Sequence, residues 1–110
     1  MSAVPPIGRR RHRLLVEIAV DAPDDNGGVQ RSWAAAGAIW ASIEPVRLAG
    51  GFAAARAEQI VTHHIVFRRR DGLTGDARLR EGDRVFRIVA IEDVDDAARF
   101  RRAQCEEIGP

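Results

Sequence analysis

The stretch Leu14–Val20, which reads LLVEIAV, decides the fold because apolar residues recur at every second position. This alternation is typical of a β-strand with one face against a core and the other against water or a neighbour. Its four alternate apolar residues are therefore predicted to share the buried face. Three further short runs follow along the chain, at residues 38–43, 64–68 and 85–91. Short strands divided by turns predict a mainly β fold, a small antiparallel β-barrel or sandwich.

Turn, bend and helix signals separate these strands. Residues 22–28 supply Pro, Asp, Asn and two glycines, the residues that reverse a chain. The small residues 34–37 predict a β-bulge or sharp bend within the second strand, which Pro45 ends. Good helix formers in residues 52–61 predict a short helix carried by one long loop. Phe100–Glu107 is expected to close the sheet as its last strand.

Trp33 and Trp40 are the two largest side chains. A small barrel can bury one or both as plugs of its core, and we expect this role for them. Stacking on nucleic-acid bases is the alternative.

The chain of 110 residues fits one domain with a single core. We assign residues 1–10 to a flexible N-terminal arm and residues 11–110 to one β-barrel domain. All 17 basic residues are Arg and the net charge is only +1, which argues against indiscriminate coating of nucleic acid. Cys105 is the only cysteine and is expected to be a buried small residue. The residues from Met1 to Ile7 show no signal-peptide pattern, so synthesis in the cytoplasm and no membrane contact are expected.

The chain shows no pattern of catalytic, cofactor-binding or metal-binding residues. It has no glycine-rich phosphate loop and no arrangement of a nucleophile with His and a carboxylate. His63 and His64 are adjacent, so they point to opposite faces of a strand and cannot readily share a metal. The cluster Asp24–Gly27 lacks the ligand spacing of a calcium loop and is interpreted as a turn. We therefore expect no enzyme activity, no cofactor and no metal.

Charge of opposite sign is concentrated in separate short segments. A basic cluster and an acidic run are predicted to form complementary subunit contacts: Arg68, Arg69 and Arg70 with Glu92, Asp93 and Asp95. Opposite patches on one small molecule favour head-to-tail contact that closes into a ring, while solvated faces without partners are the alternative. The N-terminal residues Arg9, Arg10 and Arg11 are candidates for docking on another protein, or form a solvated tail.

Several modest motifs in a fixed order carry a family resemblance. They are Trp40–Pro45, a helix of small residues, Thr62–Arg70, Gly82–Ile88 and Cys105–Glu107. In this order and spacing the chain resembles the phage head-tail joining proteins, which are the head-completion or stopper proteins of tailed phages and gene transfer agents. The chain departs from the family pattern at Ala49-Gly50-Gly51, where an acidic residue is common, and at Arg69, where an aromatic residue is common.

The resemblance implies a β-barrel subunit of a virion or phage-like particle that is assembled in the bacterial cytoplasm. It implies a ring of sixfold or twelvefold symmetry below the portal and adaptor, which closes the DNA-filled head and receives a tail terminator or another tail protein. The adaptor would meet Arg9, Arg10 and Arg11. Residues 46–61 would face a channel and contact double-stranded DNA weakly and without sequence preference, through a loop containing Arg47, Leu48, Gly50, Gly51, Phe52 and Arg56.

A monomeric nucleic-acid-binding barrel of the oligonucleotide-binding type is the rival hypothesis. It would use Trp33, Phe67 and the arginines as a stacking groove. Exposed aromatic side chains and salt-dependent binding of single strands would distinguish it from a ring-forming subunit.

Overall fold

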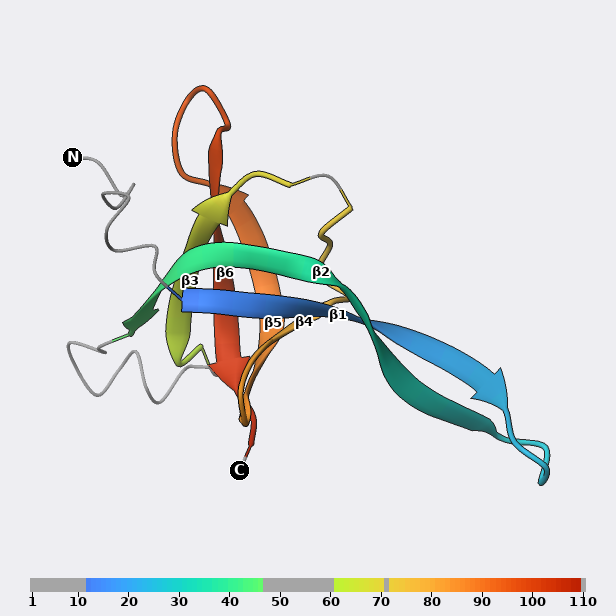
Figure 1. Cartoon of the computed structure of the whole chain (residues 1–110). Helices are drawn as coiled ribbons and strands as arrows, with labels where there is room; N and C mark the ends of the chain where they lie inside the picture. The colour runs from blue at the N-terminus through green and yellow to red at the C-terminus, as the bar shows by residue number, and fades with distance from the viewer. Residues whose placement is uncertain (1–11, 47–60, 71, 110) are drawn as a thin grey trace, which may run out of the picture.

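The computed structural model describes residues 12–46, 61–70 and 72–109, which form a closed six-stranded barrel (Figure 1). The strand order is β1-β2-β3-β6-β5-β4, and every neighbouring pair is antiparallel. The mainly β prediction is confirmed, and the described part of the chain contains no helix. Most of the predicted helix, at residues 52–60, lies outside the described residues. The strands are β1 His12–Pro23, β2 Val29–Pro45, β3 His63–Arg68, β4 Arg78–Glu81, β5 Arg84–Asp93 and β6 Phe100–Glu107.

The core consists of inward residues from all six strands. Its largest fully buried side chains are Phe67 and Phe86, with aliphatic residues and Cys105 around them. Leu14 and Val16 on β1 are buried, as the alternation predicts, and Cys105 is fully buried. The predicted burial of Leu14, Val16 and Cys105 is therefore confirmed within the barrel.

The first two strands extend well beyond the barrel wall. β1 pairs with β2 from His12 to Pro23, but β4 pairs with β1 only from Leu15 to Glu17. Residues 18–34 therefore project as a two-stranded ribbon, here called the hairpin arm (Figure 1). Ile18 and Val20, which were predicted to be buried, are 42% and 43% exposed because the barrel does not cover this part of β1.

A β-bulge lies where the hairpin arm leaves the barrel. The pairing shifts between Leu15 and Glu17, so that Ala36 and Gly37 together stand opposite Val16. Gly37 has a φ of 115°, a conformation that favours glycine. The Arg70 guanidinium donates hydrogen bonds to the carbonyls of Ala36 and Ala38, at 2.5 and 3.4 Å. The bend predicted at residues 34–37 is confirmed, and Arg70 fixes its shape.

The prediction that tryptophans plug the core is wrong. Trp40 is 59% exposed because it alternates with the buried Ile39 and Ala41. Trp33 is half-buried, and the bulge reverses its expected direction so that it shares the outer face with Glu17. Phe67 and Phe86 fill the small interior instead.

Candidate assembly interface

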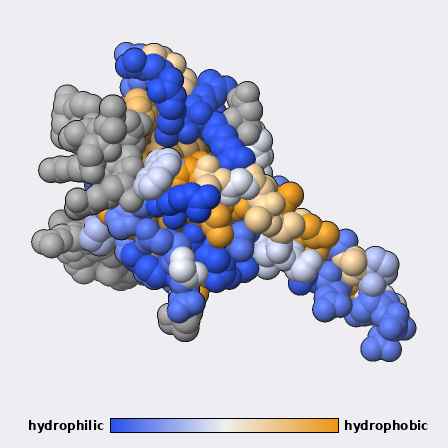
Figure 2. Space-filling view, viewed as in Figure 1, coloured by the Kyte–Doolittle hydropathy of each residue, from blue (hydrophilic) through white to orange (hydrophobic). Residues whose placement is uncertain are grey.

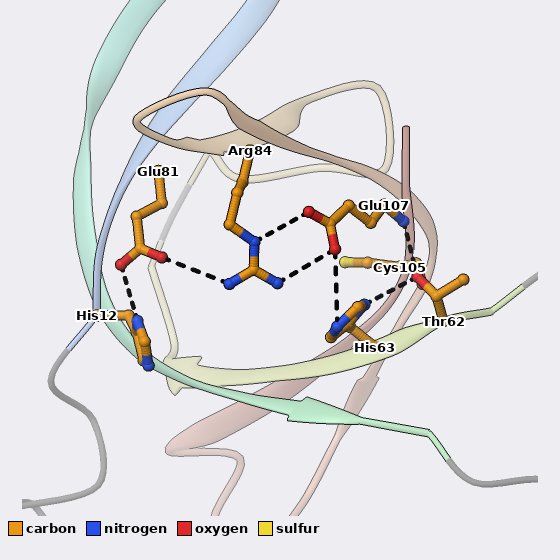
Figure 3. A network of polar contacts seen from close by, with 7 residues as sticks. All are labelled: His12, Thr62, His63, Glu81, Arg84, Cys105 and Glu107. Atoms are coloured by element: carbon orange, nitrogen blue, oxygen red, sulfur yellow. Dashed lines mark hydrogen bonds and ion pairs between the residues drawn. The ribbon is translucent and has the colours of Figure 1, made fainter. Parts of the chain in front are cut away.

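A network of polar side chains covers one end of the barrel, here called the polar end (Figure 3). Antiparallel pairing brings the starts of β1, β3 and β5 to this end together with the last residues of β2, β4 and β6. The Arg84 guanidinium donates to both carboxylate oxygens of Glu107, at 2.9 and 3.2 Å. Glu81 lies 3.9 Å from Arg84 and 2.8 Å from His12 Nδ1. The network thus links strands that are distant in sequence.

Thr62 holds together the two chain segments that border residues 47–60. The Val46 amide donates to the Thr62 carbonyl at 2.9 Å, and the Thr62 amide donates to the Cys105 carbonyl at 2.8 Å. The Thr62 hydroxyl accepts a hydrogen bond from the Glu107 amide at 2.7 Å. The segment that was predicted to face a channel therefore begins and ends at adjacent positions on the polar end.

His63, which lies beside Glu107 and Thr62 at one side of this network, is kept neutral. Its ring packs edge-on against Phe86, with centroids 5.3 Å apart and an interplanar angle of 78°. Burial lowers the pKa of His63, Glu107 opposes this shift, and the Arg84 charge adds to it. The hydrogen bond from Arg84 in turn lowers the pKa of Glu107. Arg84 therefore balances the Glu107 charge, and the imidazole remains uncharged near pH 7.

The predicted acidic contact residues are already bound within the chain. Glu92 accepts a hydrogen bond from Arg102 at 2.6 Å, and Asp93 accepts one from Arg101 at 3.0 Å. The Asp95 carboxylate caps the turn before β6 by accepting from two backbone amides, those of residues 99 and 100. Their charges are largely balanced in one subunit.

Only part of the predicted basic cluster is free to meet a partner. Arg70 is bound to the bulge in β2. Arg68 and Arg69 are exposed, and their side chains have no partner among the described residues. The Arg69 amide donates to the Arg99 carbonyl at 2.7 Å, which places these arginines beside the acidic loop at the end opposite the polar end. The structure thus brings the two predicted patches side by side in one subunit.

An ion-pair cluster fixes the root of the hairpin arm to the barrel. Arg78 and Arg80 of β4 donate to Glu17 of β1 at 2.7 and 3.2 Å. Burial raises the pKa of Glu17, but the hydrogen bonds and charges of Arg78 and Arg80 outweigh it, so the net pKa is lowered. The Arg78 guanidinium also lies over the Trp33 ring, 4.1 Å from its centroid. The direction of the hairpin arm is therefore set by β4.

The remaining predicted contact residues lie outside the described residues. Their neighbours His12, Val46 and Thr62 lie at the polar end. The residues concerned are Arg9, Arg10 and Arg11 for the adaptor, and Arg47, Leu48, Gly50, Gly51, Phe52 and Arg56 for the channel.

The stacking groove of the rival hypothesis is contradicted. Phe67 is 1% exposed, and Arg78 covers the Trp33 ring. These two side chains cannot form an open platform for bases, although Trp40, which that groove did not include, is 59% exposed. Among the described residues, no helix is long and apolar enough to cross a membrane.

Sequence reasoning missed the polar end and the hairpin arm. The polar end joins residues separated by up to 69 positions, and no local pattern encodes such contacts. The hairpin arm had a signal: β2 is 17 residues long, which exceeds the length of an ordinary strand in a small barrel.

Comparison with known proteins identifies the family. The model of a family described as phage head completion protein matches residues 5–108. The chain belongs to this family and is therefore a structural protein of the head-tail region of a virion, as the resemblance predicted.

Two solved structures share the fold. A chain of a structure described as "Virion of native gene transfer agent (GTA) particle" is 28% identical, with a TM-score of 0.66 over 91% of this chain and 96% of that one. The solution structure of protein SF1141 from Shigella flexneri 2a is 22% identical, with a TM-score of 0.69 over 94% of this chain and 96% of that one. No curated protein sequence matches the chain significantly.

Proposed function

We propose that this chain is a stopper subunit that forms a sixfold or twelvefold ring below the portal and adaptor. The ring closes the DNA-filled head and receives the tail. The observation that carries this proposal is the 28% identity to a chain of a gene transfer agent virion, over nearly the full length of both chains. A relative of equal length and fold within an assembled particle favours the same place in the particle.

In this proposal, residues 47–60 form the channel loop. The neighbouring positions of Val46 and Thr62, which border the segment, support it, because Val46 bonds to Thr62 and Thr62 bonds to β6. A loop held in this way is attached to the barrel at both ends. Arg47 and Arg56 provide weak, non-specific contact with the DNA phosphates.

The paired charges of the barrel support weak DNA contact. Arginines on β4, β5 and β6 are bound to carboxylates, such as Arg84 to Glu107 and Arg102 to Glu92. A paired guanidinium offers a phosphate less net attraction than a free one. Such a surface lets a genome slide past, whereas a strongly basic channel would hold it.

Deletion of residues 48–54 tests the proposal. Particles carrying the deletion are expected to package DNA and then lose it, measured as nuclease-accessible DNA per particle. The matched control replaces the same seven residues with Gly and Ser, which keeps the span between Val46 and Thr62 and leaves Arg47 and Arg56 in place but removes Leu48, Phe52 and the alanines of this segment. Deleted particles that retain DNA and remain infectious or competent in gene transfer would rule out the channel role.

A further inference from the structure

A groove at the root of the hairpin arm has no role in the function proposed above. Its volume is about 730 Å³, and the arm, the segment before β4, β5 and the C-terminal residues line it. The apolar lining includes Ile18, Ala77, Ile88 and Ile108, while the charged lining consists of Arg31, Arg78 and Arg87 together with one carboxylate, Asp76. Figure 2 shows an apolar zone that continues from the barrel onto the arm.

The groove lies beside the part of β1 that extends past the end of β4. β4 begins at Arg78 and pairs with β1 no further than Glu17. Beyond that point, in the described part of the chain, β1 has a paired neighbour only on its β2 side. Unpaired backbone groups on such an edge are a template for another strand. An incoming segment can therefore continue the line of β4 and cover Ile18, which is 42% exposed.

The tip of the hairpin arm has the complementary chemistry. Residues 20–30 contain three aspartates and no basic residue, and they expose Val20 by 43% and Val29 by 69%. Two of these aspartates are used internally: Asp21 accepts hydrogen bonds from Arg31 at 2.7 and 3.1 Å, and Asp24 accepts them from the amides of residues 26 and 28 at 2.8 Å. Asp25 is exposed, and its carboxylate has no partner among the described residues.

The arginines at the rim of the groove can accept this acidic tip. Arg31 and Arg87 pair with carboxylates of their own subunit, but their side chains remain 60% and 52% exposed. A guanidinium has five donors, so each arginine has donors left for a second carboxylate, although its own partner weakens the attraction. The apolar floor of the groove thus matches the exposed valines of the tip, and its three arginines, set against the single carboxylate of Asp76, match the carboxylate of Asp25.

The turn at residues 24–28 cannot fold back into the groove of its own subunit. The hairpin arm is an antiparallel ribbon that leads away from the barrel (Figure 1), and residues 18–23 of β1 span about 17 Å at the rise of a strand. We propose that residues 20–30 of one copy dock in the arm-root groove of a second copy, head to tail. This inference rests on the proposed ring and names the contact that holds it, because a head-to-tail contact repeated by rotation closes into a ring.

Cross-linking inside particles tests this contact. The double variant with Asp25→Cys and Ile108→Cys places one thiol at the tip and one beside the groove. A short bis-maleimide reagent is expected to join copies into a ladder of dimers, trimers and higher oligomers. The buried native Cys105, whose pKa burial raises to about 12, does not compete for the reagent. The matched control combines Asp25→Cys with Asp96→Cys, at the end of the barrel opposite the polar end, and is expected to give no ladder.

Each outcome separates this inference from the proposed function. Double-variant protein present in the particles but without a ladder would overturn the docking contact and leave the stopper role intact. Wild-type protein missing from the head-tail junction would overturn the stopper role itself. The single variants Asp25→Cys and Ile108→Cys show whether each substitution permits incorporation.

A charge placed in the groove gives a second test. Ile18→Glu is expected to reduce incorporation into particles by about tenfold or more, because a carboxylate would meet the acidic tip of the neighbour. The thermal midpoint of the isolated protein is expected to change little, since Ile18 is already 42% exposed. Incorporation at the wild-type level would contradict the proposal.

Discussion

Gly37→Ala tests how the chain directs the hairpin arm. A φ of 115° costs an L-residue about 1–3 kcal/mol. An added Cβ would also collide with the Arg70 guanidinium, which donates to the carbonyls of Ala36 and Ala38. The guanidinium ends a flexible side chain and can move away, so relief of the collision costs the hydrogen bonds to these two carbonyls, about 1–2 kcal/mol. We therefore expect a loss of about 2–5 kcal/mol, a large share of the roughly 5–15 kcal/mol that holds a small domain folded.

The assay is urea denaturation of the isolated protein, with two comparison variants. Gly82 also has a positive φ, 61°, but an added Cβ there would meet nothing within 4 Å, so Gly82→Ala should cost only about 1–2 kcal/mol. Adding Arg70→Ala to Gly37→Ala removes the collision, so the double variant should be more stable than the sum of its single changes predicts. Equal costs at the two glycines, together with strict additivity, would refute this account of the bulge.

Three further predictions concern charge and burial. Burial lowers the pKa of His63 and His64 below the ordinary 6.5, so on acidification the unfolded chain takes up protons before the folded chain does. The stability that these residues contribute is complete above about pH 6.5 and is lost as the pH falls through their folded-state pKa values. Replacing both histidines with Gln should flatten this fall, measured by denaturation at a series of pH values. Glu17→Gln weakens the hold of Arg78 and Arg80 and should cost about 1–3 kcal/mol in urea denaturation; a change of a few tenths would contradict the arm-root cluster. Arg69→Glu should reduce incorporation into particles while leaving the melting temperature unchanged, whereas normal incorporation would exclude Arg69 from subunit contacts.

The strands were predictable because residues on the inner face of the barrel are apolar and those on the outer face are mostly polar, which gives an alternating pattern. The alternation at Leu14 and Val16 predicts a buried face, and the small residues before Gly37 predict the bulge. The same alternation wrongly predicts burial of Ile18 and Val20. Alternation indicates which residues lie on the same face of a strand, but it does not indicate where the neighbouring strand ends. The length of β4 determines how much of β1 is covered, and a strand of four residues between two turns is too short to show a clear alternation.

The candidate interface was less predictable because its charged side chains form ion pairs with residues that are distant in the sequence. The sequence places Glu92, Asp93 and Arg68 in separate clusters of like charge, but strand pairing sets the acidic residues beside Arg102 and Arg101. Arg70 is part of a basic cluster in the sequence, but in the structure its guanidinium donates a hydrogen bond to the Ala36 carbonyl in the bulge of β2. Burial of tryptophan was expected from its size alone, yet Trp40 follows the parity of its strand and faces outward.

Electron cryomicroscopy of intact particles can show where this chain lies. We expect a ring of this barrel between the portal and the tail, with residues 47–60 of every copy directed toward the channel. A head-tail junction built without this chain, or a ring whose 47–60 segments all face outward, would contradict this expectation.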